Sequence, residues 1–491
     1  VAMEFDALLH DGRPPSSNGG PNGCRSCGTA PAAIDSEEFC EQLPPALAER
    51  VRPWADHPRI RLLSDDGRQR LVRLVMRASQ AVEAGTCSIE AAARFIDWLE
   101  PLLRRENYLA LMVERPEVQL RLLRLLGLAF FGYVAVAALF GPDLLVNPTF
   151  GVVYVLLWVG LVPASLLFGP FYKAVNPVRT LHLLFSLLTG GDPKRGMYDL
   201  PRWVGYWPAA VGLFAFVWLE LVYPDATYLS PIRLWFAIYL AVLLVGSALF
   251  GSEWFERADP FEVYSTLVGH LSVFGRREDG LLVLRSPLAN LDAVPAGPGL
   301  VAVVSVLFGS TAFDSFKDMN AWLQFSQTTS LPMTWVNTLV MLGFCVVVGL
   351  SLTAATVAAD PREGVRRSDL PALFAHSVVP IIVGYMVAHY LTYFVESGQQ
   401  TLIQLSDPMG TGANLLGTAD GEVNYWLSTH PTFLAVTKVL AVVTGHVLGV
   451  IAAHDRAMKL LPKRHQLTGQ LPLLVVMVFY TITGLYLLFG A

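Results

Sequence analysis

Four histidines lie inside long apolar stretches of this chain and are the side chains best suited to chemistry: His376, His389, His446 and His454. Ionisable groups are costly to bury in lipid, so those inside apolar runs are the first candidates for a functional site. Imidazole titrates near neutral pH and binds transition metals, which suits hydrolysis, proton transfer and electron transfer. Depth and position around each helix decide which of the four can act together.

Three of these histidines are expected at similar depth near the cytoplasmic surface. If the helix bearing His376 runs outward and the next one runs back, His446 lies about 12 Å above His454 and His376 falls between them. Three imidazoles could hold Zn²⁺ or another divalent transition metal and leave a position open for water. Such a metal would activate that water for hydrolysis. Two alternatives stay open: haem ligation by His376 and His446, and simple hydrogen bonds across the helices.

A second candidate site lies nearer the outer surface, about 20 Å from His376 along the same helix. His389 and Glu396 are seven residues apart and share a helix face. Asp314, at the outer end of another apolar stretch, is expected at comparable depth, and Lys438 could pair with either carboxylate. A histidine with a carboxylate could bind a metal, relay protons or admit a cation. The alternative places Glu396 in the water of the lipid headgroups.

The composition indicates that these side chains are positioned by membrane helices. Hydrophobic residues make up 53% of the chain and charged residues 15%, whereas a soluble protein carries roughly 25% charged residues. Nine apolar stretches are long enough, or nearly so, to cross a hydrocarbon layer of about 30 Å. They run from about 125–142, 149–170, 206–223, 231–252, 298–313, 331–356, 372–395, 432–454 and 470–490. The fold class is therefore all-α, a polytopic membrane helix bundle of about nine transmembrane helices.

Loop charges predict the orientation, because cytoplasmic loops retain Lys and Arg. Sixteen basic residues fall in the loops 171–205, 253–297, 357–371 and 455–469, and the intervening loops hold one, Lys317. The pattern predicts a cytoplasmic N-terminus, an outer C-terminus and a bacterial cytoplasmic membrane. At the cytoplasmic ends, Arg179 is expected to pair with Glu253 or Glu256 as a structural clamp. Glu220, near the outer end of the third stretch, is expected to snorkel or pair.

The residues before the first apolar stretch differ in composition. Residues 1–43 form a Gly-, Pro- and Ser-rich leader that is expected to be disordered, and residues 44–126 have the three- and four-residue apolar steps of a small soluble helical segment. The transmembrane domain then takes up 127–491. Cys24 and Cys27 have the spacing of half a zinc knuckle that Cys40 could complete, but the second half of such a motif is missing and free thiols are the favoured interpretation. The net charge of −5 gives no sign of nucleic-acid binding.

Two stretches resemble known families. The first carries Leu43-Pro-Pro-Ala-Leu-Ala-Glu-Arg50, Arg68-Gln-Arg-Leu-Val-Arg-Leu74 and the run from Phe95 to Glu117. From about 44 to 127 the chain resembles the helical region between the catalytic domains of bacterial glutamine-synthetase adenylyltransferase. The nucleotidyltransferase signature of that family, a Gly-Ser turn followed by an Asp-x-Asp pair, is absent from residues 1–128. The resemblance therefore implies no transferase activity.

The second resemblance runs from about residue 129 to the end. Its stretches include Trp158–Gly169, Asn176–Arg179, Gly309–Asp314, Ala375–Pro380, Ser406–Pro408, Gly417–Asp420 and Ala453–Arg456. This part resembles bacterial membrane proteins described as fenitrothion hydrolase-like, which implies hydrolysis of an organophosphorus triester or another small apolar ester. The leading expectation is a metal-dependent membrane hydrolase acting on a small molecule. The alternatives are a transporter or proton conductor using His389 and Glu396, and a haem or copper redox protein.

Overall fold

The computed structural model describes residues 42–55, 65–85, 88–93, 96, 116–276 and 282–490. The chain divides into two compact units, one of residues 1–113 with 276–284 and one of residues 114–275 with 285–491. Almost all of the predicted leader, together with Cys24, Cys27 and Cys40, lies outside the described residues. The predicted cysteine cluster therefore stays a prediction.

The first unit is helical where it is described. Helices α3 (Pro45–Ala55) and α5 (Asp65–Glu83) carry apolar side chains at three- and four-residue steps. Those side chains form a small separate core: Leu43, Leu47, Ala48, Val51, Val72, Val75, Ala78, Ala92, Ala93 and Ile96. Charged residues such as Arg52 and Arg77 remain on the outside of these helices. The described helices of this unit therefore have their own small hydrophobic core, and the solubility of the segment stays a prediction.

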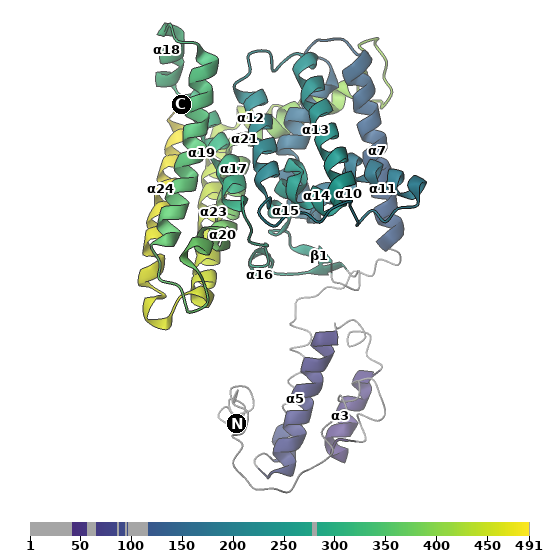
Figure 1. Ribbon diagram of the computed structural model, residues 1–491, viewed down its shortest axis with the longest axis vertical. Coiled ribbons are helices and arrows are strands. Elements are labelled where there is room, and N and C mark those ends of the chain that lie inside the picture. The colour runs from purple at the N-terminus through teal and green to yellow at the C-terminus, as the bar shows by residue number, and fades with distance from the viewer. Residues whose placement is uncertain are drawn as a thin grey trace. The chain divides into compact units, whose positions relative to one another are not determined.

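Seven helices of the second unit are long and apolar enough to cross a membrane. They are α7 (Pro116–Phe140), α13 (Leu229–Phe250), α17 (Leu300–Lys317), α19 (Met333–Val357), α21 (Val379–Gln404), α23 (Pro431–Leu460) and α24 (Leu471–Phe489). Helix α7 runs unbroken through residues 126 and 127, where the sequence predicted a domain junction. This set of helices fits a multi-pass membrane protein (Figure 1).

The other two predicted spans are irregular. Residues 148–168 form α8 (Pro148–Phe150), the π-helix η1 (Gly151–Val159) and α9 (Leu161–Phe168), with a bend of 45° between Pro148–Val159 and Leu161–Phe168. Helix α12 (Trp207–Leu221) has only 15 residues, or about 22 Å at 1.5 Å per residue. The described residues therefore contain seven helices with the length and composition of a span, or up to eight when the bent pair counts as one, and the ninth expected span corresponds to the shorter helix α12.

Helix α21 lies at the centre of the second unit. With the 3-10 and α-helical turns before it, it forms a candidate span whose apolar window is 83% buried, whereas the window of α7 is 6% buried. Glycines let α23 approach it closely: a Cβ at Gly445 would lie 2.5 Å from the carbonyl oxygen of Pro380. Helices α17 and α19 also pack side by side, and Gly309 permits that contact (Figure 1). The central helix is thus screened from lipid by its neighbours.

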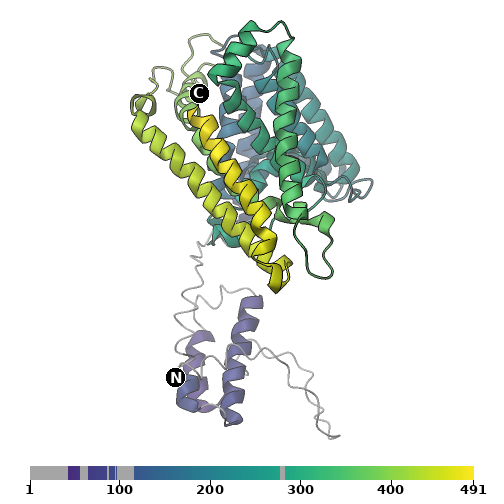
Figure 2. The same ribbon diagram turned by 90° about the vertical axis from the view of Figure 1, so that its left-hand side faces the viewer.

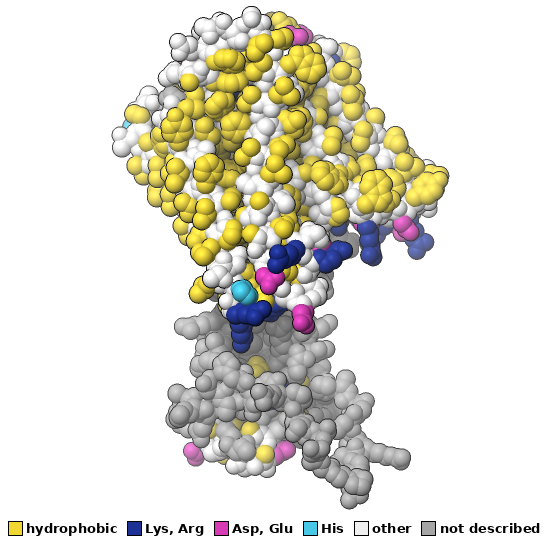
Figure 3. Space-filling view, turned by 60° about the vertical axis from the view of Figure 1, so that its left-hand side comes forward, with side chains coloured by type: hydrophobic (Ala, Val, Ile, Leu, Met, Phe, Trp, Pro, Cys, Tyr) yellow, Lys and Arg dark blue, Asp and Glu magenta, His cyan; other side chains and the backbone are white. Residues whose placement is uncertain are grey.

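Short elements connect the spans. They are α10 (Phe171–Val175), α11 (Pro177–Thr189), α14 (Glu253–Ala258), α15 (Pro260–Gly269), α16 (Pro287–Leu291), α18 (Asn320–Thr328), η2 (Arg367–Asp369), α20 (Leu370–Phe374), η3 (Ala375–Val378), α22 (Trp426–Thr429), η4 (Lys463–His465) and η5 (Thr468–Gln470). Strands β1 (Phe274–Arg276) and β2 (Leu282–Leu284) form a two-stranded sheet. On the face in Figure 3, Lys and Arg side chains of the second unit gather at one end, and hydrophobic side chains cover most of the rest. That distribution is typical of a membrane protein with one basic surface.

Candidate functional site

A buried histidine–aspartate pair joins α17 to α21. The Nε2 atom of His389 lies 2.9 Å from Oδ2 of Asp314. The hydroxyl of Tyr390 donates to the same oxygen at 2.7 Å, and Lys317 Nζ lies 2.8 Å from Oδ1. Both oxygens of the Asp314 carboxylate are therefore paired. Lys317 supplies a positive charge directly opposite the carboxylate.

The other nitrogen of His389 meets a serine. Nδ1 lies 3.0 Å from Oγ of Ser315, and the hydroxyl of Tyr385 donates to that Oγ at 2.8 Å. Since Nε2 faces a carboxylate, Nε2 carries a proton, and in the neutral tautomer Nδ1 then accepts from Ser315. A continuous chain of donors thus runs from Tyr385 through Ser315 and His389 to Asp314.

Helical spacing explains why these side chains meet. Asp314 and Lys317 are three residues apart on α17, and Tyr385 and His389 are four residues apart on α21, so each pair shares a helix face. The rings of Tyr385 and His389 are nearly parallel, with centroids 6.4 Å apart. The ring of Tyr390 stands edge-on to the imidazole at 4.5 Å. These aromatic contacts hold the imidazole in one orientation.

The site is closed on one side and open on the other. Tyr385 and Ser315 are almost fully buried, and the side chains of Asp314 and His389 are 10% and 15% exposed. The side chain of Lys317 is 31% exposed. Water therefore has access to the network through Lys317, while the Ser315 end lies in the protein interior.

Glu220 of α12 adds a second carboxylate near this network. It is close enough to Asp314 and Lys317 to interact with their charges. Its Oε2 atom is buried and has no hydrogen-bond partner in the part of the chain that the structure describes. The sequence pointed to Glu220 as a residue that snorkels or pairs, and no ion pair involves it among the described residues. A buried carboxylate oxygen without a partner is a free acceptor beside the Asp314–His389 pair.

The structure places Glu396 outside this network. Its Oε1 atom accepts from the backbone N–H of Ser428 at 3.2 Å and from the Ser428 hydroxyl at 2.7 Å. Seven residues separate it from His389, or about 10 Å along α21, which carries it to the loop before α23. Within residues 116–276 and 282–490, Lys438 forms no ion pair with Asp314 or Glu396. Of the predicted outer set, the structure therefore brings together Asp314 and His389.

The three inner histidines do not contact one another through hydrogen bonds: two bond to nearby backbone and the third to a side chain of a neighbouring segment. Nδ1 of His376 lies 3.0 Å from Leu373 O, and Nδ1 of His446 lies 2.8 Å from Val442 O. His454 is exposed, and its Nδ1 lies 3.1 Å from Oε1 of Gln470. Within the described ranges, no three His, Cys, Asp or Glu side chains are grouped so that they could hold a metal ion. The predicted three-histidine site and its zinc-like metal therefore gain no support from the geometry.

Both buried inner histidines nevertheless have an unused ring nitrogen. The Nε2 atoms of His376 and His446 are buried without a hydrogen-bond partner among the residues described. His376 comes from η3 and His446 from α23, and Gly449 of α23 packs against Ser377, next to His376. The Nδ1 hydrogen bonds run to the backbone of each residue's own helical segment. Haem ligation by this pair stays an untested prediction.

A second charged cluster, which sequence reasoning described only in part, joins α11 to α15. Asn176 Nδ2 donates to Asp259 at 2.8 Å and to Glu262 at 3.2 Å. The guanidinium of Arg179 lies 2.5 Å from Glu262, and the hydroxyl of Tyr239 donates to Asp259 at 2.9 Å. The predicted clamp at Arg179 exists, but its main partner is Glu262. Glu256 is 4.0 Å from Arg179 and pairs with Lys173 at 2.7 Å.

Two helix N-termini meet in this cluster. Oδ1 of Asn176 accepts from the first N–H groups of α11, and Oδ1 of Asp259 does the same for α15. Each cap is followed by proline, Pro177 and Pro260. The repeated pattern could have revealed the cluster: Phe-Gly at 168–169 precedes Asn-Pro at 176–177, and Phe-Gly at 250–251 precedes Asp-Pro at 259–260. Burial, together with repulsion from Glu262, raises the pKa of Asp259 to about 7.

Comparisons with known proteins cover only a small part of the chain. No family model matches it. A stretch of 76 residues is 36% identical to the bifunctional glutamine synthetase adenylyltransferase/adenylyl-removing enzyme of Ralstonia nicotianae, which is 16% of this chain and 8% of that enzyme. No solved structure matches. The match supports a distant resemblance to that enzyme, and the fenitrothion hydrolase-like resemblance has no matching family model.

Proposed function

We propose that this chain conducts protons across a membrane and that His389 and Asp314 bind the proton. The observation that carries the proposal is the buried His389–Asp314 pair between two helices that are each long and apolar enough to span a membrane. Ionisable pairs at such positions mark proton or ion pathways far more often than they serve stability, because burying them in lipid is costly.

The hydrogen-bond chain suggests how a proton is taken up. In the resting network Nδ1 of His389 accepts from Ser315, so this nitrogen is the free basic site. When Nδ1 binds a proton, the Ser315 hydroxyl turns to donate to the carbonyl of Thr311, 3.3 Å away, and its oxygen accepts from the new N–H. Asp314 then faces an imidazolium and an ammonium.

The same geometry argues against Ser315 as a hydrolytic nucleophile. Serine, histidine and aspartate do follow one another in this network, as they do in serine hydrolases. However, Ser315 is 3% exposed, and its oxygen already accepts from Tyr385. An ester therefore has no space to approach the Ser315 oxygen, whereas the transfer of a proton along the hydrogen bonds requires no such space.

Proton flux in liposomes tests the proposal. Purified protein is reconstituted with a pH-sensitive dye inside, a pH gradient is imposed, and valinomycin with K⁺ sets the membrane potential. We expect proton entry with the wild type and at least tenfold slower entry with Asp314→Asn or His389→Gln. Glu396→Gln is the matched control, because it removes a carboxylate on the same helix that bonds only to Ser428 among the described residues. Absence of flux in the wild type, or equal loss in the control, contradicts the proposal.

A second variant separates relay from hydrolysis. Ser315→Ala removes the donor to Nδ1 but leaves the His389–Asp314 contact in place. In a relay the proton still binds, so we expect flux about fivefold slower, in line with the loss of one hydrogen bond of about 1 kcal/mol. A serine hydrolase would instead lose all turnover of a triester such as paraoxon. Triester hydrolysis by the wild type that this variant abolishes would replace the transport proposal.

For the topology we propose nine spans, with α12 as the short ninth. The alternation of sixteen basic residues in every second loop against one in the others supports this number. Single cysteines placed at Gly191 and Asp225, in a background without native cysteine, flank α12. We expect a membrane-impermeant maleimide to label them from opposite sides. Labelling from the same side would show that α12 does not cross.

A further inference from the structure

A groove between α23 and α24 opens on the side of the second unit that faces lipid. It has a volume of about 300 Å³ and is lined mainly by apolar side chains, among them Val450, Leu467, Leu471, Leu474 and Met477. The two helices lie side by side (Figure 2). Their apolar windows are only 22% and 28% buried, so most of their surface is left for the bilayer. The groove is therefore reached from the hydrocarbon layer.

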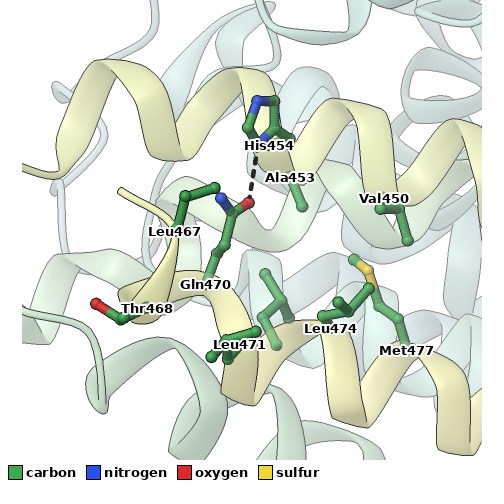
Figure 4. Close-up of a pocket in the computed structure, with 10 residues that line it drawn as sticks. Val450, Ala453, His454, Leu467, Thr468, Gln470, Leu471, Leu474 and Met477 are labelled. Atoms are coloured by element: carbon green, nitrogen blue, oxygen red, sulfur yellow. Dashed lines mark hydrogen bonds between the residues drawn. The ribbon is translucent and has the colours of Figure 1, made fainter. Parts of the chain in front are cut away.

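Polar groups lie at one end of the groove. His454 points from α23 toward Gln470 of the facing segment, and the two are hydrogen-bonded at 3.1 Å (Figure 4). Thr468 lies in the same segment and also lines the groove. The remaining lining residues are apolar. A ligand for this groove must accordingly combine an apolar body with a polar end.

Two exposed basic side chains lie close in sequence to the polar end of the groove. Lys463 and Arg464 are exposed in η4, and Arg464 is three residues from the lining residue Leu467, or at most about 11 Å along the chain. Other basic side chains in this region are matched: Arg366 by Asp369, Arg367 by Asp360 and Lys459 by Asp292. No described acidic side chain forms an ion pair with Lys463 or Arg464. Asp360, whose charge also interacts with Arg464, forms its ion pair with Arg367. Lys463 and Arg464 are therefore available to an anion.

We infer that this groove binds an anionic phospholipid, with an acyl chain between α23 and α24 and its phosphate at Lys463 and Arg464. The apolar lining matches the acyl chain, the His454–Gln470 end matches the ester region, and the two available cations match the headgroup charge. Basic clusters beside membrane helices attract anionic lipid by about 1 kcal/mol for each Lys or Arg. The inference requires only that the helices lie in a membrane, so it stands apart from the proton-binding proposal.

Thermal unfolding of the full chain in detergent tests this inference. Phosphatidylglycerol, phosphatidylcholine or inorganic phosphate is added, and the shift in unfolding midpoint is titrated. We expect phosphatidylglycerol to stabilise at concentrations where the other two do not. K463A/R464A should weaken the apparent affinity about 30-fold, the effect of two charges. Leu474→Trp, which fills the groove and leaves the charges intact, should weaken it as well.

The matched control is K194A/R195A. It removes the same charge from another basic loop, next to the end of α13, and neither residue lines the groove. We expect it to bind phosphatidylglycerol like the wild type. Equal loss in this control would mean diffuse charge attraction, and equal stabilisation by inorganic phosphate would mean a headgroup site that does not use the groove. Unchanged affinity in Leu474→Trp would also overturn the inference.

Discussion

The two buried charged clusters of the second unit are both built around buried carboxylates that accept from a tyrosine, but they differ in how completely their polar groups are paired. In the Asn176–Glu262 cluster, two helix caps, an amide, a guanidinium and a tyrosine hydroxyl satisfy both carboxylates. In the Asp314–His389 cluster, the Ser315 hydroxyl lies within hydrogen-bond distance of two acceptors, Nδ1 of His389 and the carbonyl oxygen of Thr311, and Glu220 keeps an oxygen unpaired by any described residue. The hydrogen bonds of the second cluster can therefore rearrange around Ser315.

This difference is our basis for assigning a structural role to the Asn176–Glu262 cluster and the proposed proton-binding role to the Asp314–His389 cluster. Removing one partner of a fully buried ion pair leaves an uncompensated charge, so the Arg179–Glu262 pair should control stability. A network with a titratable centre and a rotatable hydroxyl can take up a proton without breaking apart. Both clusters bury charged side chains, so burial alone does not distinguish one cluster from the other.

The largest expected effect comes from Glu262→Ala. It leaves the Arg179 guanidinium buried without its main partner, which should cost about 3–5 kcal/mol of folding free energy. Thermal unfolding monitored by size-exclusion chromatography measures this loss. The matched control is Glu256→Ala, whose pair with Lys173 is about half exposed and should contribute under about 1 kcal/mol. Equal midpoints for the two variants would contradict the structural role of the cluster.

A change of pH is expected to have an intermediate effect on folding stability. Because the pKa of Asp259 is raised to about 7 in the folded chain, from 3.8 in the unfolded one, the folded state holds an extra proton between these values. Its stability should therefore fall as pH rises from about 4 to 7, by at most about 1.4 kcal/mol per pH unit, and level off above that. Asp259→Asn, which mimics the protonated form, should flatten this slope. A slope that persists in the variant would assign it to other groups.

The smallest expected effect comes from removing the hydroxyl of either of two tyrosines, one in each cluster. Tyr239→Phe and Tyr390→Phe each remove a hydroxyl that donates to a buried carboxylate, at 2.9 and 2.7 Å. Each should cost about 1–3 kcal/mol of stability, the range for hydrogen bonds to charged groups. Only Tyr390→Phe should shift the pH dependence of proton flux, since only Asp314 belongs to the proposed relay. A shift in the Tyr239 variant would remove the distinction between the clusters.

Sequence patterns predicted which helices carry the candidate site better than they predicted which residues belong to it. The placement of Asp314 at a depth comparable with His389 followed from the order and orientation of the apolar stretches, and the structure brings the two together. Glu396 shares a helix face with His389, but its depth carries it to Ser428. Tyr385 lies four residues before His389, so the helical spacing already placed it on the same face. Ser315 lies just past the stretch 298–313, and no pattern assigned it to the site, because its role depends on contacts between α17 and α21.

The sequence by itself determined that long apolar helices build the second unit and that basic residues favour every second loop, since both follow from the solvent that each residue faces. Only the tertiary structure decided that α12 is short, that residues 148–168 bend, and that the inner histidines His376 and His446 bond to their own backbone. It also decided which buried charges are fully paired. Hydropathy is a property of single residues, whereas pairing depends on the distance between helices far apart in the chain.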